Sequence, residues 1–228
     1  MSLSLAIETE HAQPPSLAHT HFSSDPLALT EILDPAMTLA VWQREHAGLE
    51  QLELIRQEAQ SALLDADWRD IRIACNPSDM PSVLNELWGT KYPHLQADIS
   101  LLSDMFACLL DAEQVAIRLV RLDRAMCPRF HTDKIPCRLV TTYQGAGTEW
   151  LEESSIERQY LGRGANGKAD SASGLIRPDA VVQQLQPMDV GILKGDAWPG
   201  NEGRGIVHRS PSCDPTQPRI VMTLDFAA

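Results

Sequence analysis

The sequence predicts an α+β fold in which an N-terminal helical layer packs on a strand-rich core of the jelly-roll kind. Up to about Glu113, apolar residues recur mainly at helical spacing, whereas from about Gln114 short apolar runs alternate with Gly, Pro and Asp. Several short strands at close spacing are typical of a sandwich or barrel. We therefore expect one domain over 25–228, divided into a helical layer at 25–113 and a jelly-roll core at 114–228.

The beginning of the chain has the composition of an unstructured segment. Residues 1–24 are rich in Ser, Pro, Thr and His without apolar periodicity, so we expect a disordered arm there. Glu8 and Glu10 stand where the apolar region of a signal peptide would run, and no Lys or Arg precedes them. Five cysteines without a C-x-x-C pair fit a reducing compartment. Together these features predict a cytoplasmic protein.

The helical layer is predicted from two amphipathic patterns. Their apolar residues recur three or four positions apart, and the second pattern follows Pro93, a residue that helices accept in their first turn. The two sets are Leu49, Leu52, Ile55, Ala59 and Leu63, and Leu95, Ile99, Leu102, Phe106 and Leu110. Residues 37–42 and 71–75 are short apolar runs that could instead be strands.

The core is predicted from short apolar runs bounded by turn residues, with no internal repeat. The expected strands are 115–122, 138–143, 181–185, 190–193, 205–208 and 219–226. A polar, Gly-rich stretch at 152–180 predicts a long loop between them.

The charge of the chain limits its partners. A formal net charge of -12 argues against a surface for nucleic acid or anionic membranes, because such surfaces depend on clustered Lys and Arg. No apolar run approaches the roughly 20 residues of a transmembrane helix. We therefore expect neither a nucleic-acid nor a membrane partner, and a small molecule or a protein side chain as substrate. The sequence leaves the oligomeric state open.

Two imidazoles and a carboxylate carry the chemical signal of this chain. Arg129–Asp133 reads R-F-H-T-D, and Gly205–Pro211 reads G-I-V-H-R-S-P. In an extended segment residues i and i+2 share a face, so His131 and Asp133 can reach one ion. His208 lies on a later predicted strand, and two His with one carboxylate form the triad of non-haem Fe(II) oxygenases. We predict that His131, Asp133 and His208 bind the metal and carry the catalysis.

Arg219 is the candidate anion-binding residue. At the start of a predicted strand it shares a face with Val221 and Thr223. A guanidinium inside a barrel needs an anion, and a carboxylate is its best partner. The alternative is a surface arginine that pairs with Asp214 or Asp225.

The surroundings of the metal require further polar residues. A metal-bound imidazole needs a hydrogen-bond partner at its second nitrogen. Thr141, Tyr143 and Glu149 are the candidates, and we predict that Thr141 and Tyr143 belong with Arg219 to the cofactor-binding set.

His131, Asp133, His208 and Arg219 resemble the signature of the Fe(II)/2-oxoglutarate-dependent oxygenase superfamily: H-x-D, a distal His, and an Arg further along. The resemblance covers residues 115–226. It implies a double-stranded β-helix, a cupin-like jelly-roll, with helices packed on its outside. It also implies bound Fe(II), and 2-oxoglutarate as a co-substrate whose distal carboxylate pairs with the arginine.

Longer strings indicate a narrower group. C-P-R-F-H-T-D, G-T-E-W-L, L-K-G-D-A-W-P-G-N-E-G-R-G and H-R-S-P together resemble a bacterial group, domain-of-unknown-function family 1826. This match runs over most of the chain. It implies a shared fold and transfers no settled activity.

Two alternatives to an oxygenase stay open. Cys127 lies four residues before His131 and Cys137 four residues after Asp133, and a thiolate ligand would favour Zn(II) and a zinc-binding protein of metal homeostasis. A buried free Cys is also an ordinary core residue. The second alternative is a non-catalytic, cupin-like sensor whose pocket takes a small organic acid.

Overall fold

The architecture consists of two β-sheets and a layer of helices. The computed structural model describes residues 19–48, 50–65, 68–214 and 216–227. A seven-stranded sheet has the order β1-β2-β8-β5-β10-β4-β3, and a three-stranded sheet has the order β7-β6-β9. Neighbouring strands pair antiparallel except β1 and β2, which pair in parallel. The strands are β1 (His19–Ser23), β2 (Met37–Trp42), β3 (Asp70–Cys75), β4 (Val115–Leu122), β5 (Cys137–Gln144), β6 (Glu149–Leu151), β7 (Gln183–Gln184), β8 (Val190–Lys194), β9 (Val207–Arg209) and β10 (Arg219–Phe226).

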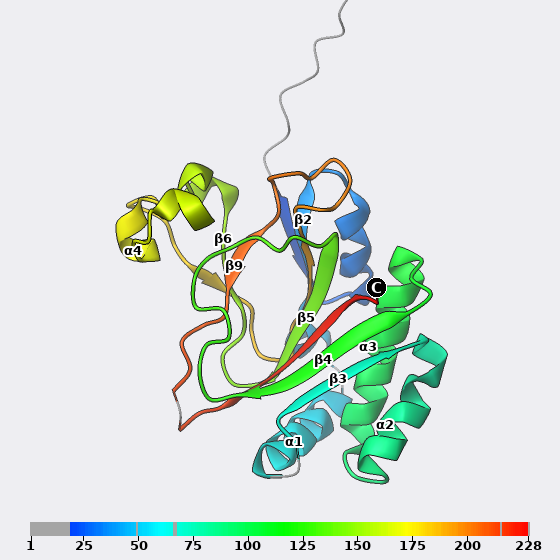
Figure 1. Ribbon diagram of the computed structural model, residues 1–228. Helices are drawn as coiled ribbons and strands as arrows, with labels where there is room; N and C mark the ends of the chain where they lie inside the picture. Colours follow the sequence, from blue (N-terminus) through cyan, green and yellow to red (C-terminus); the bar gives the residue numbers. More distant parts are fainter. Residues whose placement is uncertain (1–18, 49, 66–67, 215, 228) are drawn as a thin grey trace, which may run out of the picture.

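Three α-helices cover one face of the large sheet (Figure 1). They are α1 (Gln51–Leu64), α2 (Met80–Trp88) and α3 (Pro93–Leu110). Because side chains alternate along a strand, only every second residue of β10 meets these helices: Ile220, Met222 and Leu224. The two helical patterns are confirmed, since their described residues are buried apart from the half-buried Leu110, and Leu49 lies outside the described residues.

A buried ion network joins the helical layer to the large sheet. Arg44 lies in the short 3-10 helix η2 (Arg44–Ala47), directly after β2, and pairs with Asp98 of α3 at 2.6 Å. Asp98 also accepts a hydrogen bond from the Tyr143 hydroxyl at 2.8 Å. All three side chains are almost fully buried, so each charge or dipole is compensated where water is excluded.

The opposite face of the large sheet packs against the small sheet, and a second apolar core fills the space between them (Figure 1). This core contains residues from β2, β4, β5, β8 and β10 together with residues of the small sheet. Its members are Leu39, Val41, Val120, Leu122, Val140, Trp150, Leu185, Leu193, Ile206 and Val221.

The segment 152–180, expected as a loop, connects β6 to β7 through four short helical turns. These are η4 (Glu153–Ser155), η5 (Arg158–Tyr160), η6 (Gly162–Ala165) and α4 (Asp170–Ser173), which lie beside β6 and β9 in Figure 1. A third, small core holds this segment against the small sheet. It consists of Phe130, Leu151, Ile156, Leu175 and Val207.

The fold is mixed α and β, as predicted, and the strands at 115–122 and 219–226 have the predicted bounds. The prediction of a disordered arm over 1–24 is wrong for residues 19–23, because these pair with β2 at the sheet edge. Residues 1–18 lie outside the described residues. The predicted helical layer at 25–113 also contributes β2 and β3 to the large sheet.

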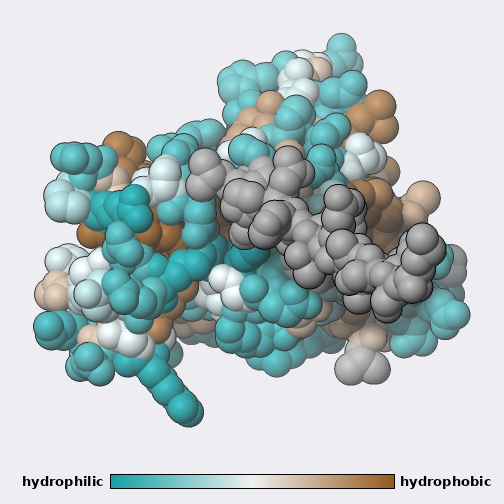
Figure 2. Space-filling model, turned by 90° about the horizontal axis from the view of Figure 1, so that it is seen from above, coloured by the Kyte–Doolittle hydropathy of each residue, from teal (hydrophilic) through white to brown (hydrophobic). Residues whose placement is uncertain are grey.

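The surface agrees with the charge of the sequence. Outside the grey atoms, the face seen in Figure 2 is mainly hydrophilic. Within the described ranges, none of the helices combines the length and apolarity that a bilayer crossing requires.

Candidate metal centre

His131 and His208 are brought together by their own backbones. His131 follows β4 in the loop before β5, whereas His208 is the central residue of β9. The two residues form an antiparallel bridge, in which each amide N–H donates to the carbonyl of the other at 3.0 Å. Their ring centroids lie 4.6 Å apart. A contact across 77 positions of the chain therefore sets the spacing of the two imidazoles.

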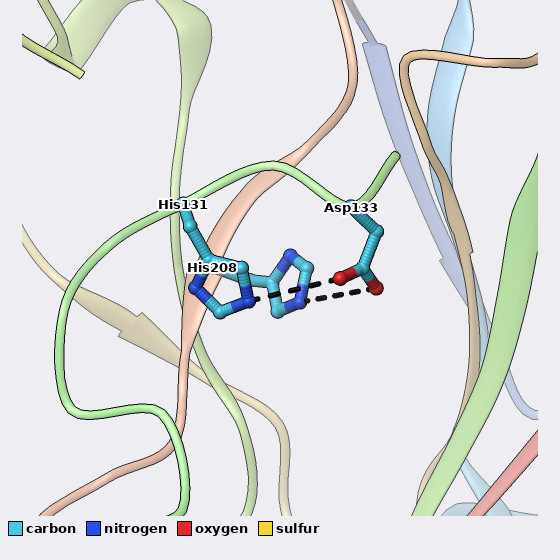
Figure 3. A group of neighbouring side chains, drawn as sticks. All are labelled: His131, Asp133 and His208. Atoms are coloured by element: carbon cyan, nitrogen blue, oxygen red, sulfur yellow. Dashed lines mark ion pairs between the residues drawn. The ribbon is translucent and has the colours of Figure 1, made fainter. Parts of the chain in front are cut away.

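Asp133 completes the group. Its carboxylate oxygens lie 3.7 Å from His131 Nε2 and 3.6 Å from His208 Nε2, and both imidazoles point toward it (Figure 3). One ligand atom from each residue lies within 4.8 Å of the others, which is the spacing of a group that can hold one metal ion. The structure thus places the three predicted ligands in one cluster.

Backbone carbonyls determine which imidazole nitrogen is available in each histidine. His131 Nδ1 lies 2.9 Å from the carbonyl of Arg129, and His208 Nδ1 lies 3.1 Å from the carbonyl of Ile206. A carbonyl can only accept, so each Nδ1 carries a proton and Nε2 is the nitrogen left to bind a metal. This is the arrangement that prepares an imidazole for a metal.

Burial keeps His208 neutral. Removal from water lowers its pKa to about 4; the nearby Asp133 carboxylate opposes this effect and His131 adds to it. At neutral pH the Nε2 lone pair of His208 is therefore free, and a metal has no proton to displace there.

Arg138 holds the third ligand. This residue of β5 donates from Nη1 to Asp133 Oδ2 at 3.0 Å, and from Nε and Nη2 to Asp225 of β10, both at 2.8 Å. Burial acts to lower the pKa of Arg138, but the two carboxylates outweigh it and the pKa is raised. The guanidinium thus stays charged and fixes one oxygen of Asp133.

A pocket of about 50 Å³, partly open to solvent, extends from the two histidines to Arg219. Arg219 is 2% exposed and donates to Ser210 Oγ at 3.0 Å and Thr142 Oγ1 at 3.4 Å. Its Nε is buried without a hydrogen-bond partner. Burial lowers the pKa of the guanidinium, and the nearby Cys213 thiol and Glu149 carboxylate oppose this effect. Among the described carboxylates, none lies within ion-pair distance of this guanidinium. The pocket therefore contains a buried cation without a carboxylate in ion-pair contact.

The alternative of a surface Arg219 is wrong on the same evidence. Asp225 is occupied by Arg138, and Val221 and Thr223 line the pocket beside Arg219 as the strand alternation predicted. Asp214 instead accepts hydrogen bonds from Thr216 in its own turn.

Thr141 and Tyr143 do not line the pocket, so the prediction that they belong to the cofactor site is wrong. They occupy the face of β5 that meets the helices, where Tyr143 hydrogen-bonds Asp98 and Thr141 accepts from Arg44 at 3.4 Å. Strand alternation puts Thr142 on the pocket side instead. The error is one position of strand register.

The cysteines do not join the metal group in the described part of the chain. Cys137 is fully buried on the helix-facing side of β5, where burial raises its pKa to about 12. Cys127 lines the pocket and is exposed, yet its sulfur does not belong to the cluster of ligand atoms. A zinc site built from either thiolate with His131 and His208 has no support in this geometry.

Sequence reasoning missed three polar residues of the site: Arg138, Thr142 and Ser210. Ser210 stands two positions after His208, and Thr142 stands two positions after Val140, which lines the pocket. Strand alternation would therefore have placed both hydroxyl groups on the pocket side. Their contacts with Arg219 and Asp133 depend on strand pairing over long range, which the sequence pattern does not contain.

The model of one protein family matches residues 23–225, which is most of the chain; the family is described as protein of unknown function (DUF1826). The chain belongs to the DUF1826 family. The strings that suggested this family in the sequence include both histidine segments of the candidate site. No curated protein matches this DUF1826 chain.

Two of the solved structures that are similar to this DUF1826 protein illustrate the likeness. One is the dioxygenase for auxin oxidation 1 from Arabidopsis thaliana in binary complex with 2-oxoglutarate, at a TM-score of 0.53 and 8% identity, covering 93% of each chain. The other is a proposed oxygenase from Shewanella oneidensis, at 0.51 and 12% identity, covering 92% of this chain and 89% of that one. At such identities the likeness shows a shared fold.

Proposed function

We propose that this protein is a mononuclear non-haem Fe(II)- and 2-oxoglutarate-dependent oxygenase. The observation that carries the proposal is the buried, anion-free Arg219 in the same pocket as His131 and His208. A buried guanidinium without an anion is costly, and a carboxylate ligand would relieve that cost. The pocket thus fits a metal together with an organic acid better than a metal alone.

The donor set fits Fe(II). His131, Asp133 and His208 are the proposed ligands, and two imidazoles with one carboxylate are the facial triad of this class of iron enzyme. Zinc sites that are purely structural use four protein ligands, and the described cluster contains three. Both imidazoles present a free Nε2, and Arg138 holds the carboxylate between them.

The pocket that contains Arg219 is lined by both histidine ligands as well, so one organic acid could contact the metal and the arginine together. Arg219, with the hydroxyl groups of Ser210 and Thr142, would bind the distal carboxylate of 2-oxoglutarate. The apolar side chains Val140, Leu193 and Val221 also line this pocket. His131, Asp133 and His208 would hold Fe(II), which would supply dioxygen activation: one oxygen atom would go to 2-oxoglutarate as it loses CO2, and the other to a substrate C–H bond.

The fold supports the same proposal. Two sheets that enclose an apolar core, with helices on the outer face of the larger sheet, are consistent with the double-stranded β-helix that the sequence resemblance implies. The structure of the Arabidopsis dioxygenase, which has a similar fold, contains 2-oxoglutarate. The substrate is a small molecule or a protein side chain in this proposal, and a cytoplasmic location remains part of it.

An anaerobic titration tests the function. Purified protein without an affinity tag is loaded with Fe(II) and titrated with 2-oxoglutarate, and a metal-to-ligand charge-transfer absorption is expected to appear. His208→Ala should abolish that absorption. An absent band with fully loaded Fe(II) would contradict the oxygenase, and a bound organic acid without decarboxylation under any condition would favour a sensor.

A further inference from the structure

The segment that bears two of the three proposed ligands has almost no regular structure of its own. Residues 129–134, here called the ligand loop, contribute one isolated bridge residue, His131, between β4 and β5. Metal ligands must nevertheless be held within a few tenths of an ångström to bind tightly. Other parts of the chain must therefore supply the support, and two aspartates, Asp170 and Asp196, contact the loop.

Asp170 contacts the ligand loop next to His131. Its Oδ2 accepts a hydrogen bond from the backbone N–H of Phe130 at 2.8 Å, and its Oδ1 lies 3.4 Å from Arg129 Nε. The Asp170 side chain is only 8% exposed. Because a buried carboxylate needs several donors, this one is strongly held and in turn fixes the backbone of the loop.

Asp170 also reaches the strand of the second histidine. Arg209, directly after His208, lies 3.7 Å from Asp170 Oδ2 and places its guanidinium over the Phe130 ring at 4.2 Å. The Phe130 side chain is buried in the small third core with Val207. The residues adjacent to both histidines thus share one support, provided by the 152–180 segment.

Asp196 contacts the ligand loop on both sides of Asp133. Its Oδ2 accepts from Thr132 Oγ1 at 2.8 Å and also pairs with Lys134. Its Oδ1 accepts from the backbone N–H of Gly205, at 2.9 Å, and its own N–H donates to the carbonyl of Asp133, also at 2.9 Å. These contacts turn Thr132 and Lys134 away from the metal group and leave Asp133 facing it.

The glycine before Asp196 allows this close approach. A Cβ at Gly195 would lie 2.1 Å from the carbonyl oxygen of Ile135 and 2.9 Å from that of Asp133. The segment after β8 can therefore pack directly on the ligand loop. This gives a physical role to the K-G-D string, which the proposed chemistry itself does not use.

We propose that Asp170 and Asp196 are positioning residues, which hold His131 and Asp133 respectively in the geometry that binds the metal. Neither carboxylate belongs to the ligand cluster, so their action runs through the ligand loop. The inference rests on the proposed metal site and is independent of the reaction at that site.

Metal binding alone is the measurement. Co(II) is titrated into the apoprotein, and its absorption spectrum reports both affinity and ligand geometry. Loss of such supporting hydrogen bonds costs about 10- to 100-fold in metal affinity. We expect Asp170→Asn and Asp196→Asn each to weaken Co(II) binding by about tenfold or more and to change the absorption bands.

Charge-preserving variants separate positioning from simple attraction of a cation. Thr132→Val removes only the hydroxyl that donates to Asp196, and Asp170→Glu keeps the charge but displaces the acceptor from Phe130. Both should also weaken Co(II) binding and alter its spectrum. If only the Asn variants change, and both charge-preserving variants bind Co(II) as the wild type does, a through-space charge effect explains the data and the positioning role is overturned.

The matched control is Asp179→Asn, an exposed aspartate of the same 152–180 segment, which should bind Co(II) as the wild type does. Circular dichroism of each apoprotein establishes folding, and the milder pair of variants carries the test if an Asn variant does not fold. A wild-type protein that binds no Co(II) would overturn the metal site itself. If the wild type binds Co(II) but its Fe(II)-loaded form does not turn over 2-oxoglutarate, only the proposed reaction is overturned.

Discussion

Arg219 donates a hydrogen bond to Ser210 Oγ at 3.0 Å, and Ser210 stands two residues after the proposed metal ligand His208. Ser210, directly after β9, thus links the cluster of candidate ligands to the buried guanidinium of the pocket. The guanidinium needs this hydroxyl because burial has removed it from water. This hydrogen bond joins the first residue of β10 to the segment after β9 and so relates the position of Arg219 to that of His208.

Replacement of the buried arginine should weaken co-substrate binding selectively. Arg219→Lys keeps the charge but loses the planar fork that binds a carboxylate through two hydrogen bonds. Charge-assisted hydrogen bonds are worth about 1.5–3 kcal/mol, so the Kd for 2-oxoglutarate should rise by about 10- to 100-fold. Calorimetric titration of the metal-loaded protein with 2-oxoglutarate measures this Kd. Arg177→Lys, at an exposed ion pair with Glu157, is the matched control. Unchanged affinity in Arg219→Lys would contradict the assigned role.

The hydroxyl that orients Arg219 should have a smaller effect. Ser210→Ala removes one neutral acceptor of the guanidinium, a hydrogen bond with a net value of about 0.5–1.5 kcal/mol. We expect the Kd for 2-oxoglutarate to rise about two- to tenfold while Co(II) affinity stays at the wild-type value. A parallel loss of metal affinity would instead indicate that Ser210 supports His208.

Cysteine reactivity should divide by burial. Cys127 and Cys108 are exposed, whereas Cys137 is fully buried with its pKa raised to about 12 by burial and, secondarily, by Asp225. A thiol reacts as the thiolate, so Cys137 should resist a disulfide reagent at pH 8 until the protein is unfolded. Mass spectrometry of the labelled native protein identifies the modified residues. Rapid native labelling of Cys137 would contradict its placement between β5 and the helices.

The stability of the apoprotein should depend on His208 below neutral pH. Its pKa falls from 6.5 to about 4 on folding, mainly by burial, so the unfolded state binds the proton more tightly. The free energy of unfolding therefore keeps its full value above pH 6.5 as far as His208 is concerned. It falls as the pH drops from 6.5 toward 4, by up to about 1.4 kcal/mol per pH unit. Urea unfolding in a chelator at pH 7 and pH 5 measures the free energy of unfolding. Between pH 7 and pH 5, His208→Asn should lose less unfolding free energy than the wild type does. An equal loss in the two proteins would refute the prediction.

Breaking the buried ion pair under the sheet should cost more than breaking a surface pair. Asp98→Ala leaves the Arg44 guanidinium uncompensated at 1% exposure, which costs about 3–5 kcal/mol of unfolding free energy. Asp123→Ala breaks an exposed pair with Arg69, which water screens, so the free energy of unfolding should change far less. Denaturant unfolding compares the two variants. Equal effects would show that the Arg44–Asp98 pair is hydrated.

Local patterns in the chain were sufficient to predict much of the fold and to select the three candidate ligands that the structure brings together. The alternation in 219–226 correctly placed Arg219, Val221 and Thr223 on one face, because strand geometry links each residue to its neighbours two positions away. The helical spacing from Leu95 to Phe106 was sufficient for α3 for the same kind of reason. At 19–23 the sequence failed, since polar His19 and His21 become a strand only through pairing with β2.

The sequence by itself determined the chemistry of the candidate donors: two imidazoles, one carboxylate and one guanidinium. Of these four residues, His208 and Arg219 lie in strands, as their local patterns predicted. The tertiary structure alone decided which polar groups meet them. Thr142 rather than Thr141 contacts Arg219, and Arg138, which the sequence analysis did not select, donates to Asp133. The physical reason is that these contacts depend on sheet register and on packing between segments far apart in the chain. A shift of one residue reverses the face of every side chain, and no local pattern records it.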